Sequence, residues 1–356
     1  MSASSVNSPA QGRLGKWDNL KGFLMIMVVM GHFVNQYAAW SAMMRSISLF
    51  IYSFHMPLFI FLAGLFTKKW DETRPFNWSR PLYFFLLGYI LKILIYAVKI
   101  AYHKGDGFTP FEDTGIPWYM FAMAAFMILS WLVRDCDPWI LLPVWIAAAC
   151  LAGYLDWINS VLSLSRIIVF FPFFYLGYVL DQQQVKSFTD RFPVRAAAPV
   201  VIGLTAWLCF TRINTLFPYI RLLTARNPYS TIHVAGIGFA DRLLYYVIST
   251  IISMAFISMT PAAPIPMLHT TGSRTLQIYF WHRPILYILM FSGLVAQSFL
   301  SRHLSHWELW IPLFSVLLTF LLTPAFFGWP LDQLRRWVDR LVTGRNKTPN
   351  DGSAGK

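Results

Sequence analysis

Long apolar segments recur along most of this chain, and each is close to the length that a helix needs to cross a lipid bilayer. A hydrocarbon core about 30 Å thick requires about 20 helical residues, and the backbone groups inside it must be hydrogen-bonded within a helix or a closed barrel. We therefore expect an all-α, polytopic membrane protein with about ten transmembrane helices. The expected spans are residues 19–40, 47–66, 81–102, 117–133, 139–155, 166–181, 196–212, 241–260, 276–298 and 308–328.

The composition favours the same class of protein. The 356 residues are 56% hydrophobic and 13% charged, whereas a soluble domain has about 25% charged residues. The net charge of +13 would suggest nucleic-acid binding in a soluble protein. In a membrane protein an excess of Lys and Arg marks the cytoplasmic loops. We therefore expect cytoplasmic N and C termini, the lipid bilayer as a partner, and no nucleic-acid partner.

The expected spans divide the chain into three parts. Residues 1–18 form a polar cytoplasmic N-terminus that lacks the apolar core and cleavage site of a signal peptide. Residues 19–330 form the transmembrane domain, which has to carry the chemistry. Residues 331–356 form a basic cytoplasmic tail that is partly disordered. Residues 213–240 are expected on the outside, as a short interfacial helix or a re-entrant cap.

A polar stripe follows one face of the first expected span. Lys21 and His32 are separated by about 16 Å along a helix and by only about 20° around it, and Asp18, Asn35 and Gln36 lie near the same face. Ionisable side chains are costly in hydrocarbon and tend to mark functional sites. The stripe favours a face lined by water or substrate over a buried packing stripe.

A second histidine, His55, lies inside the second expected span. That span runs back through the membrane, so His55 lies about 12 Å from its outer end and His32 about 18 Å from the inner end of the first. In a core about 30 Å thick these depths coincide. We expect both imidazoles in one cavity. The alternative is two unrelated histidines, each bonded to backbone or hydroxyl groups.

Basic residues suggest an anionic ligand that enters from the cytoplasm. Lys92 is embedded in the third span, His282 and Arg283 precede a helix-breaking Pro284, and Arg80 belongs to a basic loop cluster. Lys and Arg bind phosphate oxygens, so a polyphosphate fits this group. Topology signals and snorkelling of long side chains are the alternatives. The histidines lack the helical spacing of a metal site, and we expect no metal.

These motifs resemble the acyltransferase-3 family of integral-membrane O-acyltransferases, in particular its fucose 4-O-acetylase-like branch. The run WDNLKGFLMIMVVMGHF resembles the first-helix pattern, in which Asp18, Lys21 and His32 are the acidic, basic and histidine positions. The run FHMPLFIFLAGLF resembles the second-helix signature and contributes His55 and Gly64. Lys21 stands where many members have Arg. Three further sites resemble later family patterns: Trp118 and Tyr119 in PWYM, Ser273 in the run Gly272 to His282, and Arg74 with Arg80 near the third helix.

The resemblance implies transfer of an acetyl group, or another short acyl group, from cytoplasmic acyl-coenzyme A to a carbohydrate hydroxyl, in the inner membrane of a bacterium. Acyl-coenzyme A is then a co-substrate, with no permanently bound cofactor, and a homo-oligomer remains open. The alternative function is a transporter or flippase for a glycan or lipid-linked sugar. The site residues form three groups: catalytic His32 and His55; donor-binding Lys21, Arg74, Arg80, Lys92, His282 and Arg283; supporting Asp18, Asn35, Trp118, Tyr119 and Ser273.

Overall fold

The computed structural model describes residues 9–67, 75–105, 107–112, 115, 117–159, 163–232, 234 and 236–344. Within these ranges the chain folds into helices without a β-strand. The α-helices are α1 (Pro9–Gln36), α2 (Ala42–Tyr52), α3 (His55–Leu65), α4 (Ser79–Ala101), α5 (Trp118–Leu132), α6 (Pro138–Ala152), α7 (Leu164–Val179), α8 (Gln182–Thr189), α9 (Phe192–Thr211), α10 (Ile213–Leu216), α11 (Ile220–Leu223), α12 (Gly238–Met259), α13 (Pro266–Ser273), α14 (Thr275–Phe291), α15 (Gln297–His303), α16 (Trp307–Leu321) and α17 (Trp329–Thr343). Four 3₁₀ helices are described: Asp156–Asn159, Phe217–Tyr219, Ser230–Ile232 and Ala325–Phe327.

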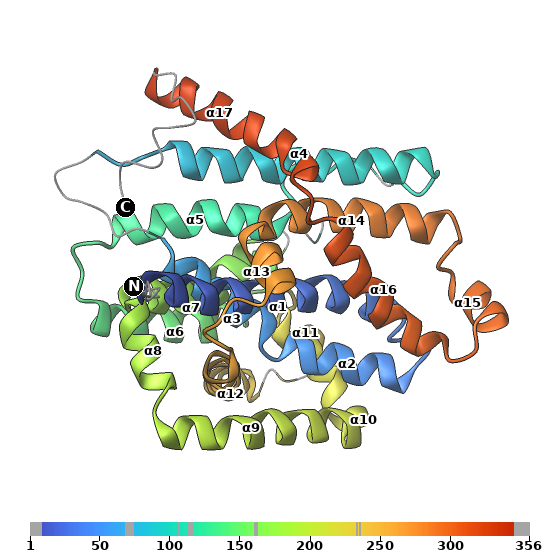
Figure 1. Cartoon of the computed structure of the whole chain (residues 1–356), viewed down its shortest axis with the longest axis horizontal. Helices are drawn as coiled ribbons and strands as arrows, with labels where there is room; N and C mark the ends of the chain where they lie inside the picture. Colours follow the sequence, from blue (N-terminus) through green and yellow to red (C-terminus); the bar gives the residue numbers. More distant parts are fainter. Residues whose placement is uncertain are drawn as a thin grey trace, which may run out of the picture.

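The helices surround a central α1. In Figure 1, α1 crosses the middle of the molecule, α4 and α17 lie together along the upper edge, and α9 lies along the lower edge. The short α8 connects the α7 region to α9, with a bend of 95° between α7 and α8. The start of α1 and the end of α17 both lie toward the left of this view.

The length and apolar character of the helices support an integral membrane protein. Among the described residues, four segments are long and apolar enough to cross a membrane: Ala42–Leu65, α4, α9 and α12. The number rises to six if α7 with α8, and α15 with α16, each form one bent span. The ten spans expected from the sequence are therefore not all present as long straight helices. The expected spans 117–133 and 139–155 correspond to α5 and α6, which are apolar but 15 residues long.

Glycines allow α3 and α7 to touch backbone to backbone. A Cβ atom added to Gly64 on α3 would lie 2.0 Å from the carbonyl oxygen of Phe174, and one on Gly177 would lie 2.0 Å from that of Phe61. Small residues at helix crossings are a common way to pack membrane helices, because lipid provides no hydrophobic force between them. This contact fixes α3, and with it His55, against α7.

A second pair of glycines holds α1 against α13. A Cβ on Gly22 would lie 2.1 Å from the carbonyl oxygen of Leu268, and one on Gly272 would lie 1.8 Å from that of Asp18. The polar end of α1 is therefore locked to the turn that leads into α14. This contact sets the position of His32 relative to the residues of α14.

We predict that Gly64→Ala strongly destabilises the protein. The added methyl group cannot fit against the Phe174 backbone, and overpacking of this kind costs about 1–3 kcal/mol or more. Gly203→Ala on α9 is the matched control, because a Cβ at Gly203 meets nothing within 4 Å. Thermal stability can be followed by size-exclusion chromatography after heating. Equal melting temperatures for the two variants would contradict the packing argument.

Candidate active site

A cavity of about 310 Å³ contains both histidines that the sequence singled out. We call it the histidine cavity. His32 on α1 and His55 at the start of α3 line it, together with Asn35 and Trp118. Tyr52 packs edge-on against His55, with ring centroids 4.8 Å apart. Two helices that follow each other in sequence thus bring their imidazoles to one polar space inside an apolar bundle.

A third histidine stands behind the first. The rings of His32 and His282 are stacked, with centroids 5.3 Å apart and an angle of 22° between their planes. His282 is fully buried on α14. The sequence grouped His282 with the donor-binding residues near Lys21, but α14 brings it to the histidine cavity. Helix α14 is held beside α1 by the Gly22 and Gly272 contacts, which sequence spacing alone does not reveal.

Backbone hydrogen bonds fix two of the three imidazoles. Nδ1 of His55 lies 2.8 Å from the carbonyl oxygen of Ile51, and Nδ1 of His282 lies 3.1 Å from that of Ile278. A carbonyl only accepts, so each Nδ1 carries the proton and each Nε2 keeps a lone pair. His32 is partly exposed to the cavity and has no hydrogen bond to the described residues. Its ring is the one best placed to engage a ligand.

Two arginines make the histidine cavity electropositive. Arg166 donates to the carbonyl oxygen of Gly115 at 3.0 Å and lies over the Trp118 ring at 5.0 Å. Arg283 lies over the Tyr287 ring at 4.7 Å, and its Nε and Nη1 atoms have no hydrogen-bond partner among the described residues. A buried guanidinium with open N–H groups suits a carbonyl oxygen that gains negative charge.

Sequence reasoning missed Arg166 and most of the residues that close the cavity. Arg166 lies at the boundary of the sixth expected span, where a basic residue passes for a topology signal. Residues 220–227 line the cavity through α11 and the loop that follows it. This segment falls within 213–240, expected as an interfacial helix or cap. Its mixed composition gave no sign of what it covers.

A second cavity, of about 530 Å³, lies at the other end of the same helices. We call it the basic cavity, because Arg80, Arg274 and Arg335 line it. Ser273 lines it as well, at the end of α13. Arg80 comes from the start of α4 and Arg335 from α17, so segments far apart in the chain meet here. The single acid in its wall among the described residues is Asp332.

Lys21 stands at the edge of the basic cavity. Its Nζ lies 4.8 Å from the ring centroid of Phe66, which lines that cavity. Its ion-pair partner is Asp18, one turn earlier on α1, with a distance of 2.5 Å between Nζ and Oδ1. His269 lies 3.4 Å from the other oxygen of the same carboxylate. Lys21 and Arg80 therefore belong to the same region, as a donor site requires.

Lys92 lies apart from both cavities. Its Nζ donates to the carbonyl oxygens of Pro110 at 2.9 Å and Glu112 at 2.8 Å. It is twelve positions from Arg80 on α4, or about 18 Å along the axis. These contacts tie the segment after α4 to the helix. Arg74, also expected at the donor site, lies outside the described residues. Tyr119 is buried between the two cavities.

No group of three or more His, Cys, Asp or Glu side chains that could hold a metal ion occurs among the residues that the structure describes. The two cavities thus offer imidazoles and guanidinium groups as their chemistry. Imidazoles with a free lone pair can accept a proton from a hydroxyl group. Guanidinium groups can bind phosphates or a developing oxyanion.

The fold and its two cavities define a helical membrane protein with the groups that acyl transfer requires. A family model described as an acyltransferase domain matches residues 14–335, nearly the whole chain. The chain belongs to this family, the acyltransferase-3 family. No curated protein and no solved structure matches the chain.

We predict that Lys92→Met lowers stability without changing the affinity for an acyl donor. The change removes two hydrogen bonds from a charged and buried donor, at a cost of about 2 kcal/mol. Thermal unfolding and the KM for acyl-coenzyme A should be measured on the same preparation. A raised KM at unchanged stability would instead place Lys92 at the donor site.

Proposed function

We propose that this protein is an O-acyltransferase that moves an acetyl group, or another short acyl group, from cytoplasmic acyl-coenzyme A to a carbohydrate hydroxyl. The acceptor is a cell-surface or secreted polysaccharide, or its lipid-linked precursor. The observation that carries the proposal is the pair of cavities, one with histidines and one with arginines, at opposite ends of the same helices. The proposal includes about ten spans, cytoplasmic termini, the inner membrane of a bacterium, and the fucose 4-O-acetylase-like branch of the family.

The basic cavity is the proposed donor site. Coenzyme A carries phosphate groups, and Arg80, Arg274 and Arg335 present guanidinium groups in one cavity of about 530 Å³. Lys21 adds a fourth cation at its edge. With cytoplasmic termini, this cavity opens to the side on which acyl-coenzyme A is found. Arg74 retains its proposed donor role from the family resemblance alone.

The histidine cavity is the proposed acceptor and reaction site. Tyr52 and Trp118 offer aromatic surfaces, while Asn35 and Asn227 offer amide hydrogen bonds. A cavity with a few polar groups among aromatic ones suits a sugar, which has both hydroxyl groups and apolar C–H faces. His55, His282 and Arg283 then act at the reacting groups or position His32.

In the proposed reaction, a ring nitrogen of His32 takes the proton of the acceptor hydroxyl. The hydroxyl oxygen attacks the thioester carbonyl carbon, and the negative charge on the carbonyl oxygen is stabilised by the open N–H groups of Arg283. The C–S bond then breaks. Coenzyme A leaves as a thiol with the proton from His32, and the acceptor keeps an ester. An acyl-His32 intermediate, formed before the hydroxyl attacks, fits the same residues.

We predict that His32→Ala lowers acyl transfer at least about 100-fold, because removal of a general base costs about that much or more. The amount of inserted protein should be unchanged, since His32 makes no hydrogen bond that holds the described fold. His303→Ala, on the exposed face of α15, is the control. Transfer is measured with radiolabelled acetyl-coenzyme A and membranes. Near-normal transfer by the His32 variant would exclude its role as base.

We predict that Arg80→Ala and Lys21→Ala each raise the KM for acetyl-coenzyme A about tenfold, with a smaller effect on kcat. A tenfold change corresponds to about 1.4 kcal/mol of lost binding. Lys104→Ala, an exposed residue beyond the other end of α4, should leave KM unchanged. Should neither variant alter KM, the phosphates bind elsewhere. The acceptor is identified by mass spectrometry of surface glycans from cells with and without the protein.

A further inference from the structure

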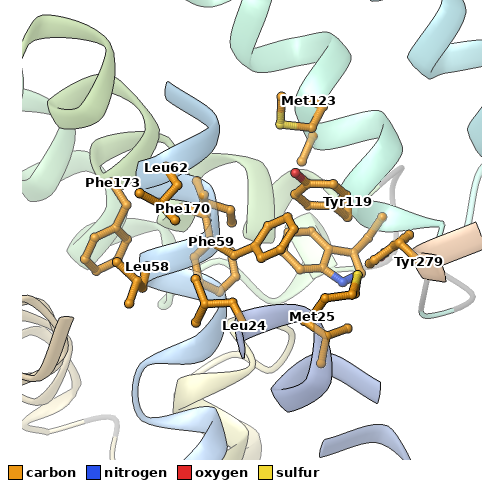
Figure 2. Close-up of a cluster of buried hydrophobic side chains, with 14 of the residues drawn as sticks. Leu24, Met25, Leu58, Phe59, Leu62, Tyr119, Met123, Phe170, Phe173 and Tyr279 are labelled. Carbon is orange, nitrogen blue, oxygen red and sulfur yellow. The ribbon is translucent and has the colours of Figure 1, made fainter. Parts of the chain in front are cut away.

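Between the two cavities lies a layer of buried apolar side chains. Figure 2 shows these side chains converging from α1, α3, α5, α7 and α14. We call this set the apolar layer, and each of its members is at most 8% exposed. Its members are Met25, Phe59, Leu62, Tyr119, Met123 and Tyr279.

The apolar layer is thin. On α5, Trp118 lines the histidine cavity and Met123 lines the basic cavity, five positions or about 8 Å along the axis. On α14, Gln277 lines the basic cavity and Tyr279 the histidine cavity, two positions or about 3 Å apart. A partition of this thickness separates the cavities by the depth of one or two side chains.

Aromatic contacts connect the apolar layer to His32. The rings of Phe59 and Tyr119 lie 5.7 Å apart, and those of Tyr119 and Tyr279 lie 5.0 Å apart. The Tyr279 ring lies 5.6 Å from His282, which stacks on His32. The hydroxyl end of Tyr119 points toward Met123 (Figure 2). The shortest route between the arginines and His32 therefore passes this side of α5.

We propose that the apolar layer, through Met123 and Tyr119, sets the length of the acyl group that the protein transfers. This inference rests on the proposed function. A thioester that enters from the basic cavity must bring its carbonyl carbon to His32, and the acyl chain lies ahead of that carbon. The chain must therefore pass the apolar layer or pack within it. Dense packing leaves no space for added methylene groups, so the layer admits short chains.

Met123 is the residue of the layer that gives way most readily. Its side chain is unbranched and flexible, which lets methionine change shape at low cost. It lines the basic cavity, so a shorter residue there enlarges the entrance to the layer without touching His32. Met123→Ala creates room for a longer acyl chain, whereas Met123→Leu keeps the volume nearly constant.

The test is a competition between acetyl-coenzyme A and hexanoyl-coenzyme A, at equal concentration, in membranes of cells that make only the wild type or one variant. Mass spectrometry gives the ratio of acetyl to hexanoyl esters on the glycans. The ratio is independent of how much protein folds. We expect a ratio above about 10 for the wild type, reduced at least fivefold in Met123→Ala and retained in Met123→Leu.

Met127→Ala is the matched control. Met127 lies one turn further along α5, is buried, and lines the basic cavity as Met123 does, but it stands further from the histidine cavity. Its loss should affect both esters alike and preserve the ratio. An unchanged ratio in Met123→Ala, or equal use of both donors by the wild type, overturns the inference alone. Absence of both esters in wild-type membranes overturns the proposed function and the inference together.

Discussion

The close approach of helix backbones at glycine is the constraint on which the rest of the structure depends. Gly64 and Gly177 join α3 to α7, and Gly22 and Gly272 join α1 to α13. In lipid such contacts replace the hydrophobic force that packs soluble helices. They bring α1, α3, α7 and the start of α14 to fixed depths. The histidines and arginines on these helices thereby meet in two separate cavities.

Local helical geometry predicts the features of the site that lie on one helix or on two consecutive ones. The three-residue spacing of Asp18 and Lys21 predicts their ion pair, and the matched depths of His32 and His55 predict a shared cavity. Both follow from a rise of about 1.5 Å per residue in a bilayer of known thickness. The membrane class follows from composition in the same way.

Features that depend on contacts between distant segments could not be derived from the sequence. Periodicity does not reveal that α14 turns His282 toward His32, nor that Arg166 faces the histidine cavity. The spans differ for a related reason. The expected span 47–66 contains a break at residues 53 and 54, between α2 and α3, and α5 and α6 are short. Hydropathy reports apolar length, whereas packing decides where each helix bends.

Helix α17 makes the C-terminal region part of the functional core. Leu331, Asp332 and Arg335 from this helix form one wall of the basic cavity, and Leu331 and Val338 bury its apolar side. The acyltransferase match also extends into it, to residue 335. Affinity tags fused close to residue 344, or truncations made before 329 to ease crystallisation, therefore alter the arginine pocket. Purification handles are better attached at the opposite end of the polypeptide.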